Sequence, residues 1–271
     1  MNNFTKRLFF GAIYVALIII AIWFNPVIYI LIFTTLMLIS IYEFQKIHQL
    51  TSFIPYLFGV TIIALFYSIN YRFLNPIIEF KYFIAFLFFL LFFPFIRTLF
   101  ISNKKAIEIL KMDFLTIVYL VIPFTIMQLI PFAIGDNKYN NQIMLGVFIL
   151  IWINDTFAYL IGKQIGKNKL FQRISPKKTI EGFIGGFIFS MLGSIILAQY
   201  FTSLPFKSWI IIALITSLFG TLGDLIESMF KRNLKIKDSS NLIPGHGGFL
   251  DRLDSVIFTT PFIYIYLILL T

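Results

Sequence analysis

Long apolar stretches alternate with short polar segments along the whole chain. Each stretch is about 20 residues long, which is the length that an α-helix needs to cross the hydrocarbon core of a bilayer. The apolar residues run continuously instead of alternating, and backbone polar groups in a bilayer must be paired within their own segment, so we predict helices. The expected fold is an all-α polytopic integral membrane protein with about nine transmembrane helices, at residues 8–24, 26–44, 53–69, 80–96, 114–134, 142–162, 180–201, 208–226 and 255–271.

The composition agrees with a membrane protein. Hydrophobic residues make up 59% of the chain and charged residues only 13%, whereas a soluble domain carries about 25% charged residues. The chain has no cysteine, which excludes disulfides and thiolate chemistry. The first apolar run follows Lys6 and Arg7 as in a signal peptide, but it lacks an obvious cleavage site and a second span follows at once, so we expect an uncleaved anchor.

The positive charges are distributed unevenly between the loops. If the N-terminus lies in the cytoplasm, 18 of the 22 Lys and Arg residues fall on the cytoplasmic side. Cytoplasmic loops carry an excess of Lys and Arg, so we predict this orientation, in the cell membrane, with the active site facing the cytoplasm. The sidedness also accounts for the net charge of +10 without a nucleic-acid partner.

The polar residues divide the chain into two parts. Residues 1–135 have short loops and are expected to form a scaffold of membrane helices. Residues 136–271 form the expected catalytic region, because the cytoplasmic loops 163–179 and 227–254 hold most of the polar groups. Membrane orientation alone does not explain the Asp, Gly and His residues of these loops.

Residues 228–254 combine basic, acidic and glycine residues between two apolar segments. Lys and Arg side chains bind phosphates, paired Asp side chains bind divalent metal ions, and glycine lets the backbone approach a ligand closely. The run therefore predicts metal-assisted chemistry on phosphate groups at the membrane surface.

Asp224 lies near the cytoplasmic end of the eighth apolar stretch. If that helix continues, Asp224, Ser228 and Lys231 share one face. An acid near a membrane span is costly and typical of a functional cavity. The alternative is an interfacial acid that reaches water or pairs with Lys231. Glu227 lies on a neighbouring face, where we expect an interfacial position.

Asp251 and Asp254 open the last apolar stretch and are spaced to share a helical face. Helix capping is the alternative, because the macrodipole stabilises acids near a helix N-terminus. The glycines before them, including Gly247 and Gly248, allow a positive φ and an anion-binding nest beside His246. A tight loop with a solvated His246 is the alternative there.

Two upstream segments carry further candidates. Residues 175–182, SPKKTIEG, place two Lys and a Thr at a helix start, where phosphate binds; orienting charge with an ordinary N-cap is the alternative. Asp155 lies inside the sixth apolar stretch and is a functional candidate or a structural partner for a neighbouring polar side chain. Residues 162–168 do not form a P-loop, because only three residues separate the glycines.

Residues 228–254 also match a known signature. They contain S-x-x-K-R-x4-K-D followed by P-x-H-G-G-x-x-D-R-x-D, which resembles the signature of the phosphatidate cytidylyltransferases, or CDP-diacylglycerol synthases. Residues 154–170, NDTFAYLIGKQIGKNKL, and the segment SPKKTIEG extend the similarity over roughly residues 150–260. The N-terminal half is similar only in its hydrophobicity and number of spans.

The resemblance implies a membrane nucleotidyltransferase that joins CTP and phosphatidate into CDP-diacylglycerol, with release of pyrophosphate, for phospholipid biosynthesis. It further implies Mg²⁺, with room for a second, monovalent cation, and a homodimer embedded in membrane lipid. The metal ligands that it implies are Asp224 and Asp251.

The remaining site residues fall into two predicted groups. Those expected at the reacting phosphates, through cationic, hydrogen-bonding or orienting side chains, are Ser228, Lys231, Arg232, Lys237, Asp238, His246, Arg252 and Asp254. Those expected to bind the substrates are Asp155, Ser175, Lys177, Lys178, Thr179, Glu181, Gly247 and Gly248.

Two other functions fit parts of the pattern. A CTP-dependent polyprenol kinase shares the membrane setting and the nucleotide but transfers the γ-phosphoryl group. A transporter or channel would place Asp155 and Asp224 on an ion path, but such sites lie near the bilayer midplane, whereas these polar residues crowd one membrane face.

Overall fold

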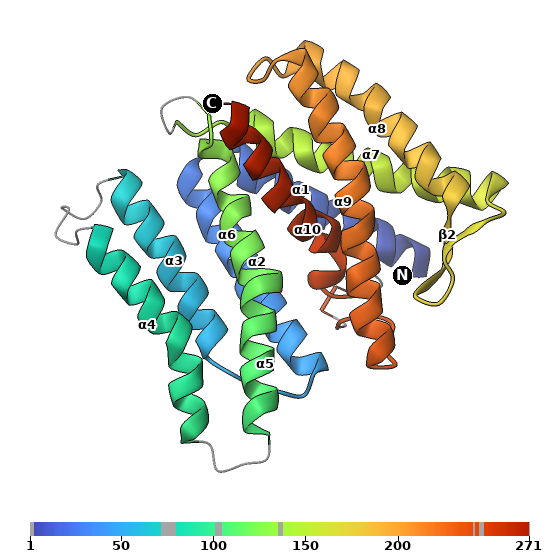
Figure 1. Cartoon of the computed structure of the whole chain (residues 1–271). Helices are drawn as coiled ribbons and strands as arrows, with labels where there is room; N and C mark the ends of the chain where they lie inside the picture. The colour runs from blue at the N-terminus through green and yellow to red at the C-terminus, as the bar shows by residue number, and fades with distance from the viewer. Residues whose placement is uncertain are drawn as a thin grey trace. The chain divides into compact units, whose positions relative to one another are not determined.

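The computed structural model describes residues 3–71, 80–100, 105–134, 138–240, 242–243 and 247–270, and these residues are almost entirely helical (Figure 1). The first helices are α1 (Asn3–Trp23), α2 (Pro26–Ile47), α3 (Ile54–Tyr71) and α4 (Phe80–Leu99). A continuous run follows, made of α5 (Ala106–Thr116), the π-helix η1 (Ile117–Val121), α6 (Ile122–Leu129) and the 3₁₀ turn η2 (Ile130–Phe132). The last helices are α7 (Asn141–Ile165), α8 (Ile180–Tyr200), α9 (Phe206–Asn233) and α10 (Leu250–Leu270).

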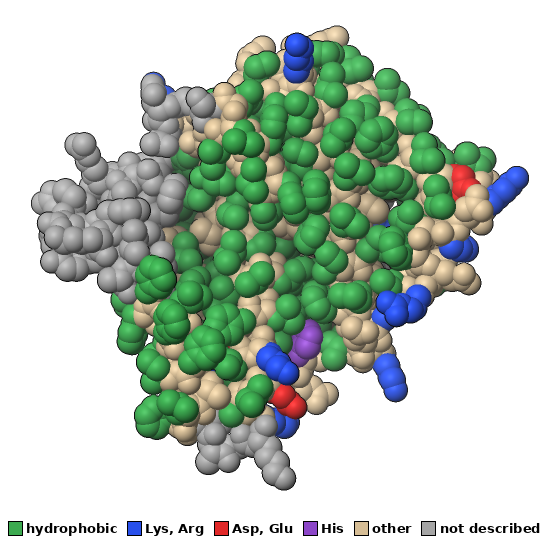
Figure 2. All heavy atoms as spheres, in the orientation of Figure 1, with side chains coloured by type: hydrophobic (Ala, Val, Ile, Leu, Met, Phe, Trp, Pro, Cys, Tyr) green, Lys and Arg blue, Asp and Glu red, His purple; other side chains and the backbone are tan. Residues whose placement is uncertain are grey.

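Every predicted apolar stretch coincides with one of these helices or with the α5–η2 run. Among the described residues, six segments are long and apolar enough to cross a bilayer: α2, the α5–η2 run, α7, α8, α9 and α10. The other three predicted stretches contain shorter apolar helical segments, Phe9–Trp23, Ile54–Ala64 and Phe88–Leu99. Figure 2 shows hydrophobic side chains covering most of the described surface on one face, as expected of helices that face lipid. The prediction of an all-α membrane protein is confirmed.

The chain forms two compact units, one of which is inserted in the sequence of the other. One unit contains Met1–Phe33 with Ile126–Thr271, and the other contains Thr34–Thr125. The predicted division at 135/136 concerns where the polar chemistry lies, and it stays a prediction. The first unit brings α1 together with α7 to α10 and contains all the candidate site residues.

Glycines bring α7 and α8 into backbone contact. A Cβ atom on Gly182 of α8 would lie 2.6 Å from the carbonyl oxygen of Ala158 on α7, and one on Gly186 would lie 2.6 Å from that of Asn154. Close approach through small residues is a common way to pack helices in lipid. The contact holds the part of α7 that carries Asp155 against the start of α8.

A short antiparallel hairpin lies between α7 and α8 (Figure 1). Its strands are β1 (Lys169–Phe171) and β2 (Ser175–Thr179), and Lys169 lies opposite Thr179. Thr179 ends the hairpin and caps α8, because its Oγ1 accepts a hydrogen bond from the Gly182 backbone N–H at 3.1 Å. The sequence analysis predicts no strand, so the hairpin is an addition to the all-α prediction.

α9 and α10 extend beyond their apolar stretches into the polar region. α9 continues to Asn233, and α10 begins at Leu250, so both helices extend past the predicted apolar stretches 208–226 and 255–271. Gly223 lets the two helices approach, since a Cβ atom there would lie 2.6 Å from the carbonyl oxygen of Asp254. The polar turns of both helices form because they pack against each other.

Candidate active site

Side chains from α7, β2, α9 and α10 meet at one polar location in the first unit. Lys178 Nζ on β2 lies 2.7 Å from Asp224 Oδ2 on α9. The charge of Asp155 on α7 interacts with both of these side chains. The charge of Asp254 on α10 interacts with all three. We call these four residues, Asp155, Lys178, Asp224 and Asp254, the carboxylate cluster.

Asp224 keeps an open side within the carboxylate cluster. Its side chain is 35% exposed, and its Oδ1 accepts a hydrogen bond from Ser228 Oγ at 3.2 Å. α9 therefore continues through Asp224 and Ser228 and places them on one face, as predicted. The alternative pairing of Asp224 with Lys231 is wrong, because Lys178 binds Asp224 and Lys231 binds other acids.

Lys231 lies in a second, more enclosed group. Its Nζ forms an ion pair with Glu227, one turn earlier on α9, and lies 2.7 Å from Asp251 Oδ1 on α10. Only 2% of Glu227 is exposed, so it is buried within the protein, and its expected interfacial position stays a prediction. We call Glu227, Lys231 and Asp251 the lysine triad. A buried lysine is tolerated when acids compensate its charge, which explains why this group closes.

The Asp251 carboxylate also holds the loop between α9 and α10. Its Oδ2 accepts hydrogen bonds from the Ser239 N–H at 2.9 Å, the Ser239 hydroxyl at 3.0 Å and the Gly248 N–H at 2.7 Å. The Gly248 bond pairs a donor just before α10, as the capping alternative expects, but the bonds from Ser239 and Lys231 go beyond capping. Gly247 has a φ of 85°, so the predicted positive φ occurs there.

Basic side chains of the two loops are exposed beside these buried groups. Lys177 precedes α8, and Arg232, Lys237 and Arg252 belong to the α9–α10 region; all four are exposed. Arg232 Nη1 also donates to the Ile236 carbonyl oxygen at 2.9 Å, near the end of α9. The site therefore combines acids, of which Glu227 and Asp254 are buried, with exposed cations, and cationic side chains hold phosphates most strongly.

Two predicted substrate-binding residues hold the chain itself. Thr179 is buried and forms the ordinary N-cap that was the alternative for this segment. The Glu181 carboxylate accepts hydrogen bonds from the backbone N–H groups of Lys167 at 3.0 Å and Asn168 at 3.1 Å. Ser175 begins β2. Substrate binding by these residues stays a prediction.

The glycine turn before α10 is described only in part. His246 lies outside the described residues, so its role stays a prediction. The backbone N–H of Ile243 donates to the Gly247 carbonyl oxygen at 2.9 Å and closes the turn. Asp238 is exposed. It lies beside Gly247, because a Cβ atom on Gly247 would be 3.4 Å from Asp238 Cβ.

Known sequences place the chain in a family. The sequence profile of the cytidylyltransferase family matches residues 5–270. This chain belongs to the cytidylyltransferase family. Similar proteins named phosphatidate cytidylyltransferase include one from Staphylococcus aureus (strain COL), 50% identical over 127 residues, and one from Staphylococcus haemolyticus (strain JCSC1435), 38% identical over 186 residues.

The two alignments differ in coverage. The first covers 46% of this cytidylyltransferase chain and 48% of the S. aureus protein, whereas the second covers 62% of this chain and 71% of the S. haemolyticus protein. Over the first alignment the chain therefore spans about half the length of its relative.

The candidate site includes residues that the sequence analysis missed. Glu227 has a usable signal, because it lies four residues before Lys231 and side chains at that spacing meet on a helix. Ser239 has none, since its role depends on how the loop folds over Asp251. The Tyr14 hydroxyl on α1 donates to the Arg252 carbonyl oxygen at 3.2 Å, and 238 residues separate the two positions, so no local pattern reveals this contact.

The donor chemistry of the cytidylyltransferase carboxylates fits a hard divalent cation, because Mg²⁺ prefers oxygen ligands. In the part of the chain that the structure describes, no group of three or more His, Cys, Asp or Glu side chains is spaced to hold a metal ion. Asp224 keeps an exposed side, whereas both Asp251 oxygens accept hydrogen bonds from the chain. The two predicted metal ligands thus differ in how open they are to a cation.

Proposed function

We propose that this protein is a phosphatidate cytidylyltransferase, which transfers CMP from CTP to phosphatidate and releases pyrophosphate. The observation that carries the proposal is the Lys178–Asp224 ion pair, because it joins the SPKKTIEG segment to α9, the helix that runs into the signature at residues 228–254. The two Staphylococcus relatives bear this name. The apolar helices give a lipid substrate access to the site, and the exposed cations can bind the phosphates of a nucleoside triphosphate.

The proposed reaction brings two polyanions together. A phosphate oxygen of phosphatidate attacks the α-phosphorus of CTP, the bond to the bridging oxygen of the β-phosphate breaks, and pyrophosphate leaves with the bonding electrons. A phosphate monoester is largely ionised at neutral pH because its second pKa is about 6, so no strong general base is required. The protein has to align the reactants and offset their charge.

The exposed cations are proposed to hold the phosphates. Lys177 comes from the hairpin, while Arg232, Lys237 and Arg252 come from the α9–α10 region, so the two loops approach a ligand from different elements. Arginine can grip two phosphate oxygens at once, which orients a phosphate group as well as neutralising it. Ser228 adds a hydroxyl donor beside Asp224.

Mg²⁺ is proposed to bind at Asp224, with Asp251 as the second predicted ligand and a monovalent cation as a further addition. A divalent ion there supplies charge stabilisation for the pyrophosphate leaving group. Asp155 and Asp254 place two further carboxyl groups near Asp224, which supports cation binding. Asp251 has to share its oxygens with Lys231 and the loop.

The proposed topology has nine spans in the cell membrane, a cytoplasmic N-terminus, a cytoplasm-facing active site and a homodimeric assembly. The placement of 18 of the 22 Lys and Arg residues supports the orientation. Helices α1, α3 and α4 contain 21, 18 and 20 residues, which supports their counting as spans.

The direct test uses the purified full chain in detergent with cytidine-labelled CTP and phosphatidate, with and without Mg²⁺. We expect a cytidine-bearing lipid and an equal amount of pyrophosphate, both dependent on Mg²⁺. Release of CDP with a phosphorylated lipid would instead identify the polyprenol kinase alternative. Absence of any labelled lipid, together with ion flux in liposomes, would favour the transporter.

A further inference from the structure

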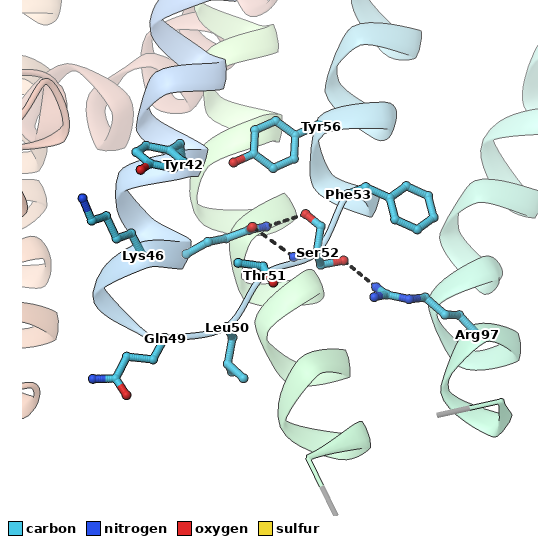
Figure 3. A pocket seen from close by; sticks show the side chains of 10 residues that line it. Tyr42, Lys46, Gln49, Leu50, Thr51, Ser52, Phe53, Tyr56 and Arg97 are labelled. Carbon is cyan, nitrogen blue, oxygen red and sulfur yellow. Dashed lines mark hydrogen bonds between the residues drawn. The ribbon is translucent and has the colours of Figure 1, made fainter. Parts of the chain in front are cut away.

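A cavity of about 760 Å³ lies within the Thr34–Thr125 unit, where α2, the loop before α3 and the end of α4 come together (Figure 3). Its lining includes Tyr42 and Lys46 on α2, Tyr56 on α3 and Arg97 on α4. This unit contains none of the candidate active-site residues. The cavity therefore calls for an explanation of its own.

The loop that forms one wall of the cavity is fixed by buried hydrogen bonds. Gln45 Nε2 donates to the Ser52 carbonyl oxygen at 2.9 Å, and Gln45 Oε1 accepts from the Ser52 N–H at 3.1 Å. Arg97 Nη1 donates to Ser52 Oγ at 2.6 Å, and Figure 3 marks these bonds with dashed lines. Gln45 and Ser52 are only 3% and 7% exposed, so this wall is preformed.

The charged residues that line the cavity are cationic. They are Lys46 and Arg97, and no Asp or Glu lines it. Arg97 Nη1 lies 3.6 Å from Oδ2 of the buried Asp113, and this carboxylate compensates part of the charge of Arg97. Lys46 forms no ion pair among the described residues, and its Nζ lies 5.6 Å from the centre of the Tyr42 ring. Among the described residues, the charge of Lys46 in the lining is therefore not compensated by an acid.

Apolar side chains lie beside the cationic lining. Phe53 and Leu57, at the start of α3, are 54% and 44% exposed. Tyr42 and Tyr56 have an apolar ring and a polar hydroxyl, a combination typical of the boundary between lipid and water. A ligand with a phosphate group and acyl chains would satisfy both kinds of surface, and basic pockets between membrane helices bind such headgroups.

We propose that this cavity binds the phosphate headgroup of an anionic phospholipid, as an accessory site outside the segments assigned to CTP and phosphatidate. Lys46 and Gln49 donate to the phosphate, while the acyl chains lie against Phe53 and Leu57. Free phosphate would use the same donors but would gain nothing from the apolar side chains, so the lipid is the expected source. The site does not depend on the proposed cytidylyl transfer.

Native mass spectrometry of the purified full chain in neutral detergent tests this site by titration with dioleoylphosphatidylglycerol. The Lys46→Glu variant is compared with Lys111→Glu, which makes the same charge change at an exposed lysine of α5 in the same unit, away from the cavity lining. A basic residue at an anionic surface contributes about fivefold in affinity, so reversing the charge of Lys46 is expected to weaken lipid retention about tenfold or more. Lipid bound elsewhere is common to both variants.

Equal lipid retention by the two variants would overturn the proposal. Wild-type protein that retains dioleoylphosphatidylcholine as well as the anionic lipid would overturn the charge selectivity. Inorganic phosphate that displaces the lipid in a Lys46-dependent manner would overturn the lipid assignment. If Lys46→Glu fails to fold, Lys46→Gln takes its place, with an expected loss of roughly fivefold.

Discussion

The carboxylate cluster and the lysine triad are neighbours on α9, yet they are built in opposite ways. In the cluster, three acids share one lysine, and Asp224 keeps an exposed side. In the triad, one lysine lies between two acids, and both Asp251 oxygens accept hydrogen bonds. The first has three acids to one lysine and room for a ligand, whereas the second has two acids to one lysine and is closed. Two aspartates with the same predicted role thus have different surroundings.

The largest effect is expected from Asp224→Asn. The amide keeps a partner for Ser228 but removes the charge that would hold Mg²⁺, so we expect liponucleotide synthesis to fall by about 1,000-fold. Because the cluster has three acids to one lysine, thermal unfolding in detergent should change little. Retained synthesis at millimolar Mg²⁺ would refute the role of Asp224.

Unlike Asp224→Asn, the Asp251→Asn variant should lose thermal stability as well as liponucleotide synthesis. Removing one acid from a buried ion pair costs about 3 kcal/mol, and the loop loses an acceptor for Ser239 and Gly248. We expect a lower melting temperature and faster hydrogen exchange in residues 239–248. If activity is lost while hydrogen exchange in that loop stays unchanged, Asp251 behaves like Asp224. The contrast between the lysine triad and the carboxylate cluster would then be wrong.

Glu227→Gln should have a smaller effect, because Lys231 keeps Asp251 as a partner. We expect Glu227 to position Lys231 and, through Asp251, the loop, so the KM for CTP should rise roughly tenfold while kcat changes little. Steady-state kinetics and hydrogen exchange of the loop measure both consequences. Glu108→Gln, at an exposed acid of α5, is the control and should match the wild type. Identical kinetics in both variants would show that Glu227 has no positioning role.

The smallest effect is expected from Gly247→Ala. A Cβ atom is strained at a φ of 85°, which costs about 1–2 kcal/mol per residue. Gly248→Ala is the matched control, because it keeps the N–H that Asp251 accepts and, among the described glycines, only Gly247 has a positive φ. Thermal unfolding should separate the two variants, and equal melting temperatures would contradict the described turn.

The helices could be predicted from the sequence because continuous apolar runs of this length have one stable form in lipid. Their polar ends could not be placed to the residue, since no apolar pattern reveals the Lys231–Asp251 ion pair that joins the last turns of α9 to α10. The hairpin before α8 could not be predicted from the sequence either. Its short strands show no alternation, and Glu181 holds it through backbone donors of the preceding loop.

The candidate site could be predicted as a set of residues but not as a set of pairs. The i, i+4 spacing places Ser228 beside Asp224, and the structure confirms that contact. The partner of Asp224 is Lys178, which lies 46 positions earlier in the chain, on β2. Local periodicity carries no information about such a contact, and for the same reason it does not show that Lys231 pairs with Asp251 instead of Asp224.

The hydrogen bond from Tyr14 to Arg252 also has a consequence for biosynthesis. A ribosome makes α1 before α10, and the two partners are 238 positions apart. The bond therefore forms only after residue 252 has left the exit tunnel. Until then Asp155 and Asp224 enter the membrane without their α10 neighbours, Arg252 and Asp254. A nascent chain that stalls before residue 252 therefore leaves both acids without these neighbours.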